Sequence, residues 1–162
     1  MARKSKEPQP KIFTVEMELS TKDPRNIAKA VLTFQGINHS GLSYEGRVFL
    51  NNKKANEKTK KSLANGYAGS FFIFGHGGRC YGGPGHCAIP TSDMRDPYDL
   101  RRSNPLTPTS RDVRITEQFT KAIRKNKKIT VTVVPVIRSY DEMADIENAF
   151  QCEKITLLTF TK

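Results

Sequence analysis

The chain has 162 residues, a formal net charge of +11 and an apolar fraction of 36%. This length fits one domain that buries roughly 70% of its unfolded surface. No apolar run approaches the roughly 18 residues needed to cross a bilayer, and the basic N-terminus leads into no apolar signal core, so we expect no membrane span and a cytoplasmic location. The charge favours an acidic partner, and a basic surface without a dedicated ligand is the alternative interpretation.

The positive charge is concentrated in three segments, residues 3–6, 53–61 and 121–128. Residues 1–11 contain two prolines and no periodic pattern, which indicates a flexible basic arm before a single domain over residues 12–162. A basic surface of this kind is a candidate for binding nucleic acid or an acidic protein. The candidate partner-binding lysines are Lys53, Lys54, Lys60 and Lys61.

Short alternating or β-branched segments predict strands at 12–19, 30–37, 44–50, 67–74, 112–115, 129–137 and 155–160. Thr116 is placed to cap one short helix, and Pro135 suggests an edge strand or a bulge. Residues 53–63 form either a loop or an exposed helical turn, and 146–150 stay ambiguous. These elements argue for a sandwich or barrel, and we expect an all-β fold: an antiparallel β-sandwich of about seven strands.

A long glycine- and proline-rich loop spans residues 75–110. Its first part, residues 75–87, holds two of the three histidines, two of the three cysteines and six of the eleven glycines. Two imidazoles and two thiolates suit a tetrahedral zinc site or a soft copper(I) site, with the ligand set His76, Cys80, His86 and Cys87.

Two other interpretations of this loop remain open. A disulfide between Cys80 and Cys87 would need an oxidising compartment. In a purely structural loop, the glycines allow the backbone to turn and the histidines bond to carbonyls. The third cysteine, Cys152, lies beside a strand-like segment and is interpreted as packed rather than reactive.

Several segments in order resemble the C-terminal β-sandwich domain of polyphenol oxidases and tyrosinase-family proteins. They are Val31 to Ile37, Arg47 to Asn52, Tyr67 to Phe72, Val113 to Glu117 and Val131 to Pro135, and the resemblance covers roughly residues 12–160. The Gly-Ser-Phe strand, the Ile-Thr-Glu helix start and the Val-Thr-Val-Val-Pro strand are the most specific pieces. Each motif alone is weak evidence for the family, and the ordered set is more specific.

The catalytic half of that family holds two coppers with six histidines, whereas this chain has three histidines in total. The resemblance therefore implies a non-catalytic accessory domain, one that shields or loads a type-3 copper oxidase partner. It makes Tyr81, with its neighbour Arg79, a candidate for contacting the partner; packing of Tyr81 within the loop is the alternative. A different function also stays open: a structural subunit of an oligomeric assembly, whose basic arm and patches bind an acidic partner or nucleic acid.

Overall fold

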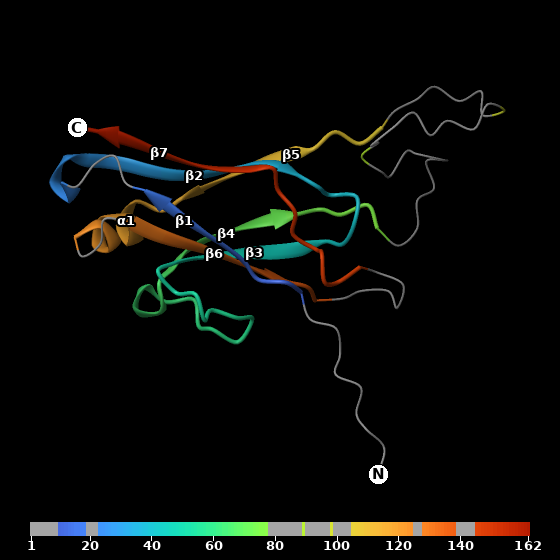
Figure 1. Cartoon of the computed structure of the whole chain (residues 1–162), viewed down its shortest axis with the longest axis horizontal. Coiled ribbons are helices and arrows are strands. Elements are labelled where there is room, and N and C mark those ends of the chain that lie inside the picture. Colours follow the sequence, from blue (N-terminus) through green and yellow to red (C-terminus); the bar gives the residue numbers. More distant parts are fainter. Residues whose placement is uncertain are drawn as a thin grey trace, which may run out of the picture.

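The computed structural model describes residues 10–18, 23–77, 89, 98, 105–124, 128–138 and 145–162. Figure 1 shows its strands and its one α-helix within the described residues, α1 (Thr116–Ile123). The strands are β1 (Phe13–Glu18), β2 (Ile27–Ile37), β3 (Tyr44–Leu50), β4 (Tyr67–Ile73), β5 (Thr109–Arg114), β6 (Lys128–Val136) and β7 (Lys154–Thr161). Two 3-10 segments are η1 (Pro24–Asn26) and η2 (Leu63–Asn65). The predicted all-β fold is confirmed.

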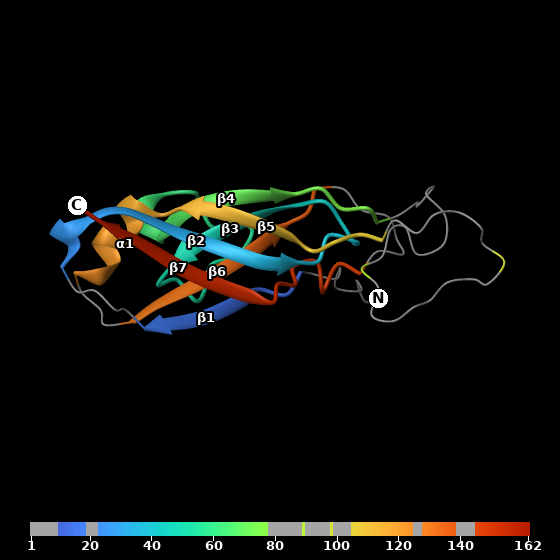
Figure 2. The ribbon, with the colours of Figure 1, turned by 90° about the horizontal axis from the view of Figure 1, so that it is seen from above.

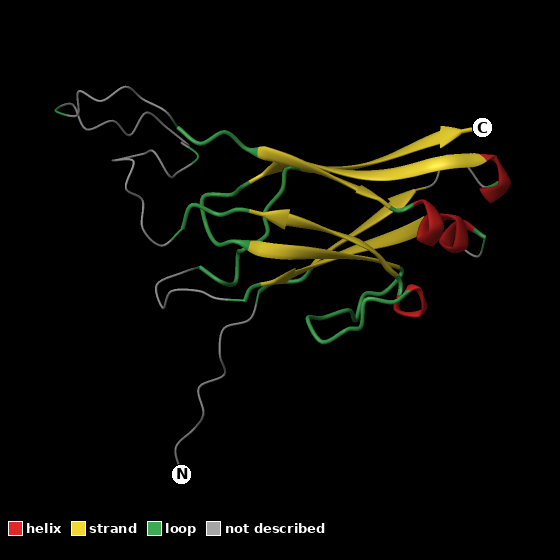
Figure 3. Ribbon diagram, turned by 180° about the vertical axis from the view of Figure 1, so that it is seen from behind, coloured by secondary structure: helices red, strands yellow, loops and turns green. Residues whose placement is uncertain are grey.

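The strands form two antiparallel sheets that lie face to face (Figure 2). Sheet A has the order β1-β6-β3-β4, and sheet B has the order β5-β2-β7. The edge strands β4 and β5 contact each other on one side of the sandwich. Figure 3 shows α1 at one end of the sandwich and the turn between β2 and β3 at the other, which we call the loop end. The residues on either side of the predicted long loop emerge at the loop end.

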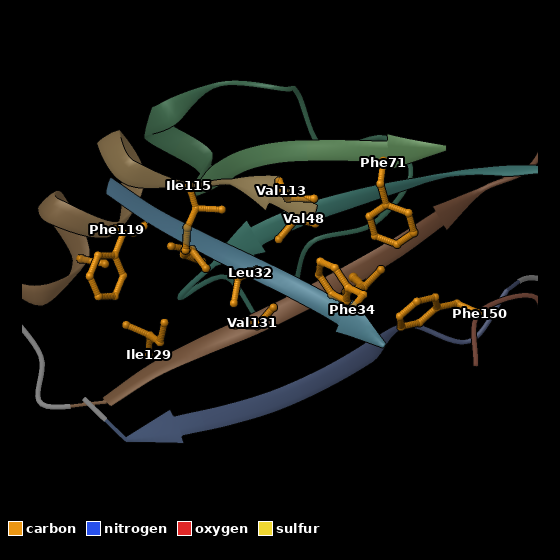
Figure 4. Close-up of a cluster of buried hydrophobic side chains, with 14 of the residues drawn as sticks. Leu32, Phe34, Val48, Phe71, Val113, Ile115, Phe119, Ile129, Val131 and Phe150 are labelled. Atoms are coloured by element: carbon orange, nitrogen blue, oxygen red, sulfur yellow. The ribbon is translucent and has the colours of Figure 1, made fainter. Parts of the chain in front are cut away.

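An aromatic cluster joins the two sheets near the loop end. The ring of Phe34, from sheet B, lies 4.9 Å from the ring of Phe71, from sheet A. Phe150 completes the cluster, at 6.2 Å from Phe34 and 5.9 Å from Phe71. Figure 4 shows these rings grouped together, while Phe119 and Ile129 fill the core at the helix end. Burial of each such side chain contributes roughly 1.5–3 kcal/mol, so this cluster is a main source of cohesion between the sheets.

Strand β6 is buried on both of its faces. One face points into the core between the sheets. On the opposite face Thr132 and Val134 are also buried, because the loop that follows β3 covers the outside of sheet A. Within that cover, Ala55 packs against Phe49 and Val134. The lysine-rich segment 53–63 is therefore a loop of turns, one of the two forms expected; Ala55 anchors it, and most of its other residues are exposed.

The start of α1 differs from the prediction. The residue at the helix N-cap is Ile115, and no side chain caps the helix. The hydroxyl of Thr116 instead accepts a hydrogen bond from the backbone N–H of Ala30 in β2 at 3.1 Å, and Ile115 N–H donates to the Ala30 carbonyl at 2.9 Å. Thr116 thus fastens the helix to sheet B, and its predicted capping role is wrong.

No helix among the described residues is long and apolar enough to cross a membrane.

Two strands begin earlier than the apolar pattern predicts. Strand β2 starts at Ile27 and β5 starts at Thr109, each three residues ahead of the predicted start. The early part of β5 is polar, but Thr109 and Arg111 are half-buried while Ser110 is exposed. Alternation is therefore present there without apolar residues. The ambiguous segment 146–150 forms a turn.

Pro135 occupies neither an edge strand nor a bulge. Strand β6 lies inside sheet A, and its pairing with β3 runs without a register shift. Pairing with β1 ends at Val133, two residues before the proline. Proline lacks a backbone N–H, so it fits where a second neighbouring strand is no longer present.

Gly46 provides a test of the aromatic cluster. It lies opposite Phe71 in register, and a Cβ atom at position 46 would lie 2.3 Å from the Phe71 ring. The ring cannot move aside easily because Phe34 and Phe150 pack against it. We expect Gly46→Ala to lower the free energy of unfolding by about 1–3 kcal/mol, measured by urea denaturation.

Gly41→Ala is the matched control, because a Cβ at that position would meet no other atom within 4 Å. Its midpoint should stay at or slightly above the wild-type value. Equal midpoints for Gly46→Ala and wild type would show that Phe71 does not rest on Gly46.

Candidate functional site

Residues 75–77 follow β4 and begin the predicted long loop. They lie against the turn between β2 and β3. The backbone N–H of His76 donates to the carbonyl of His39 at 3.0 Å, and that of Gly77 donates to the carbonyl of Gly41 at 2.7 Å. One residue before His76, the backbone N–H of Gly75 donates to the hydroxyl of Ser43 at 3.0 Å. These bonds hold residues 75–77 against the turn at residues 39–43, and we call the two segments together the stem.

Glycine is required for the two chains of the stem to approach this closely. A Cβ atom at position 75 would lie 2.1 Å from the carbonyl oxygen of Gly41 and 2.3 Å from the backbone of Leu42. A Cβ at position 77 would lie 2.7 Å from the same oxygen of Gly41. Backbone atoms cannot yield as a flexible side chain can. Two of the six glycines in residues 75–87 therefore serve packing of the stem.

The described residues that return from the long loop are tied to the same end of the sandwich. The ring nitrogen Nε2 of His39 lies 2.8 Å from the carbonyl oxygen of Thr107 and donates to it. Arg111 donates from Nε to the carbonyl of Phe72 at 3.0 Å, which links β5 to β4. His39 therefore contacts both the outgoing chain, at His76, and the returning chain, at Thr107.

The fold brings two of the three histidines together. The rings of His39 and His76 have their centroids 5.1 Å apart and are inclined at 71°. His76 is exposed and His39 is half-buried. The sequence did not single out His39, although its place in a polar turn directly after a strand and the scarcity of histidine were signals available in it.

Three of the four predicted metal ligands and two of the six predicted partner contacts lie outside the described residues. They are Arg79, Cys80, Tyr81, His86 and Cys87, and they remain predictions. Within the described ranges no group of three or more histidine, cysteine or acidic side chains could hold a metal ion.

Cys152, the one cysteine that is described, packs against the core, as the sequence indicated. It is half-buried, and burial raises the pKa of its thiol. A thiol with a raised pKa has less of the reactive thiolate form at neutral pH.

The four predicted partner-binding lysines lie on the loop that covers sheet A, and two of them are in ion pairs. Lys53 pairs with Glu16 at 2.5 Å, and Lys61 pairs with Glu45. Lys54 and Lys60 are exposed. Whether any of the four contacts a partner stays a prediction.

Glu45 is a second residue that the sequence did not single out. Its side chain is only 4% exposed and lies on the outer face of sheet A. Arg47 donates to its carboxylate at 3.1 Å, Ser70 donates at 2.8 Å, and Lys61 reaches it from the covering loop. Burial acts to raise the pKa of Glu45, but the hydrogen bonds from Lys61, Ser70 and Arg47 outweigh it, so the pKa lies below its ordinary value.

The comparisons with known proteins bear on the fold. No family model and no curated protein sequence matches the chain. Among solved structures, latent aurone synthase, a polyphenol oxidase, from natural source matches at 16% identity with a TM-score of 0.50, over 93% of this chain and 24% of that chain. The recombinant enzyme co-crystallised with hexatungstotellurate(VI) matches at 17% identity with a TM-score of 0.52, over 98% of this chain and 26% of that chain.

These matches show a likeness in fold to part of a polyphenol oxidase. The chain spans about a quarter of the length of the matched oxidases. The likeness extends over nearly all of this chain, as the sequence resemblance to the tyrosinase-family C-terminal domain implied.

Neutralising Glu45 should loosen the cover over sheet A. We expect Glu45→Gln to lower the free energy of unfolding by about 1–3 kcal/mol near neutral pH, because Arg47 and Lys61 lose their carboxylate. The folded pKa lies below the ordinary value of 4.5, so this stabilisation is present above pH 4.5 and is lost as the pH falls through the folded pKa. Denaturation curves of both proteins across this range should therefore converge at acidic pH.

Glu16→Gln is the control, because its pair with Lys53 is exposed to solvent on both sides. We expect no measurable change in its denaturation midpoint. A similar loss in both variants, or a difference between wild type and Glu45→Gln that persists in acid, would contradict the assigned role of Glu45.

Proposed function

We propose that this chain is a non-catalytic domain that docks onto a partner protein through the loop end of the sandwich. The observation that carries the proposal is the match of nearly the whole chain to about a quarter of a longer oxidase chain. In the matched oxidases this fold forms one part of a longer chain. A separate domain of the same fold is suited to packing against a catalytic partner protein. The three histidines of the chain are half the number that a two-copper centre of the tyrosinase family uses.

Two exposed aromatic side chains mark the docking surface. Phe72 is 64% exposed and Phe74 is 85% exposed. Phe72 is in β4 and Phe74 comes directly after it, so the alternation of strand side chains places both on the same face. His76 comes two residues later. Aromatic residues dominate the energetics of protein interfaces, and these two are the most exposed phenylalanines among the described residues. Arg111 holds the Phe72 carbonyl, so the backbone under the patch is fixed before a partner binds.

We infer that the partner is a type-3 copper oxidase and that docking covers its active-site mouth. The support comes from the matched oxidases, which are described as latent, and from the sequence resemblance to the domain that shields such sites. Tyr81 and Arg79 are the residues proposed to face the mouth. A role in copper loading through His76, Cys80, His86 and Cys87 is part of the same proposal.

The test uses type-3 copper oxidases from the organism that produces this chain, purified without a domain of this fold. Binding is measured by calorimetry, and oxidase activity is measured with and without the chain. We expect a stable complex with reduced activity, and we expect the double variant Phe72→Ser, Phe74→Ser to bind at least tenfold more weakly, because both rings lose their buried area.

Phe160→Ser is the matched control. Phe160 is 50% exposed on β7 in sheet B, away from the proposed surface. Its affinity should equal that of wild type. The proposal fails if no oxidase binds, or if the control weakens binding as much as the double variant does.

The covering loop favours a second candidate function, the binding of nucleic acid. Lys53 and Lys54 line a shallow pocket with Lys128 and Glu16. Lys54 is exposed there, and Lys58 and Lys60 extend the positive surface along the loop. Double-stranded DNA that binds with a steep salt dependence, and that is lost in the triple variant Lys54→Gln, Lys58→Gln, Lys60→Gln, would support this candidate. Equal binding by the triple variant and wild type would exclude these lysines as the binding surface.

A further inference from the structure

We propose that His39 and His76 together bind a transition-metal ion of the zinc type. The observation is their meeting at the stem, where two residues 37 positions apart place their rings 5.1 Å from each other. The proposal pairs His39 with His76, the one predicted ligand that the structure describes. It does not rest on docking to an oxidase, because binding of the metal is a property of this chain alone.

Each ring has one nitrogen directed at a backbone carbonyl. Nε2 of His39 donates to the carbonyl of Thr107 at 2.8 Å. Nδ1 of His76 lies 3.4 Å from the carbonyl of His39, the weaker of the two contacts. A carbonyl only accepts, so each of these nitrogens carries the proton, and the lone pair is left on Nδ1 of His39 and Nε2 of His76. Metal-binding histidines ordinarily donate their other N–H to a carbonyl or carboxylate in this way, which fixes both tautomer and ring orientation.

The distance between the rings fits a shared ion. A zinc–nitrogen bond of about 2.0–2.1 Å, extended by about 1.1 Å to the ring centre, places each centroid roughly 3.2 Å from the metal. At a tetrahedral angle two such centroids lie about 5 Å apart. The observed separation of His39 and His76 is 5.1 Å. Edge-to-face packing of two rings gives a similar distance, so the proposal needs a test that separates binding from packing.

Two imidazoles alone leave positions open around the ion. Within the described residues no third potential ligand joins the pair. Thiolates and imidazoles are the ligands that zinc and related ions prefer, and water can fill a remaining position.

The test titrates the full, reduced chain with cobalt(II) and zinc(II), and follows the visible spectrum of cobalt and the heat of binding. The variants are chosen to keep the hydrogen bonds of the stem. In His39→Gln the amide nitrogen replaces Nε2 as donor, and in His76→Asn it replaces Nδ1, so each variant removes only the free ring nitrogen. We expect one ion per chain for wild type and at least tenfold weaker binding for each variant.

Unchanged urea midpoints in both variants will show that the stem is intact without metal. The variant Cys80→Ser, Cys87→Ser is titrated alongside. Loss of binding in this variant together with wild-type affinity in His39→Gln would overturn the proposal, because His39 would then be no ligand. The absence of stoichiometric binding to the wild-type chain would overturn it as well.

Discussion

The contact between Phe34 and Phe71 holds the two sheets together, and the loop end of the molecule depends on it. Phe71 can lie flat across β3 only because position 46 is glycine. Phe150, arriving from the turn before β7, closes the cluster, with ring centroids 5.5 Å from Phe13 of β1. The cluster therefore brings together strands of both sheets and the turn before β7. The turn between β2 and β3 begins directly beyond it.

The turn between β2 and β3 makes two kinds of contact, and these explain why the segment packed against it, residues 75–77, contains two glycines. It reverses the chain between the two sheets, and it accepts hydrogen bonds from the backbone N–H groups of residues 75–77. So close an approach excludes side chains at Gly75 and Gly77. His39 then bonds to Thr107 on the returning chain. A segment that would otherwise cost entropy to order is thus fixed at both of its described ends before any ligand or partner arrives.

Local patterns predicted the strands well, and long-range contacts account for most of what was missed. Alternation marks β1, and β-branched runs mark β6, because these properties are contained in neighbouring residues. The start of β5 escaped because inward residues there, such as Thr109, are polar. The start of β2 escaped because two consecutive exposed residues, Ala28 and Lys29, interrupt the alternation where its pairing with β7 shifts register. Thr116 was assigned as a cap because the sequence does not show that Ala30 lies beside it. His39 and Glu45 gain most of their interest from partners distant in sequence, such as Thr107 for His39 and Ser70 for Glu45, and spacing along the chain does not show these contacts.

The central claim is that His39 joins the outgoing and returning ends of the glycine-rich segment on the sandwich. Nuclear Overhauser spectroscopy of the full chain tests this directly, since cross-peaks require protons that lie close together, as they do in rings packed edge to face. We predict cross-peaks between the ring protons of His39 and His76, from His39 to Thr107, and slow exchange of the Gly77 amide proton. Absence of the His39–His76 cross-peaks, together with rapid exchange at Gly77, would contradict the account.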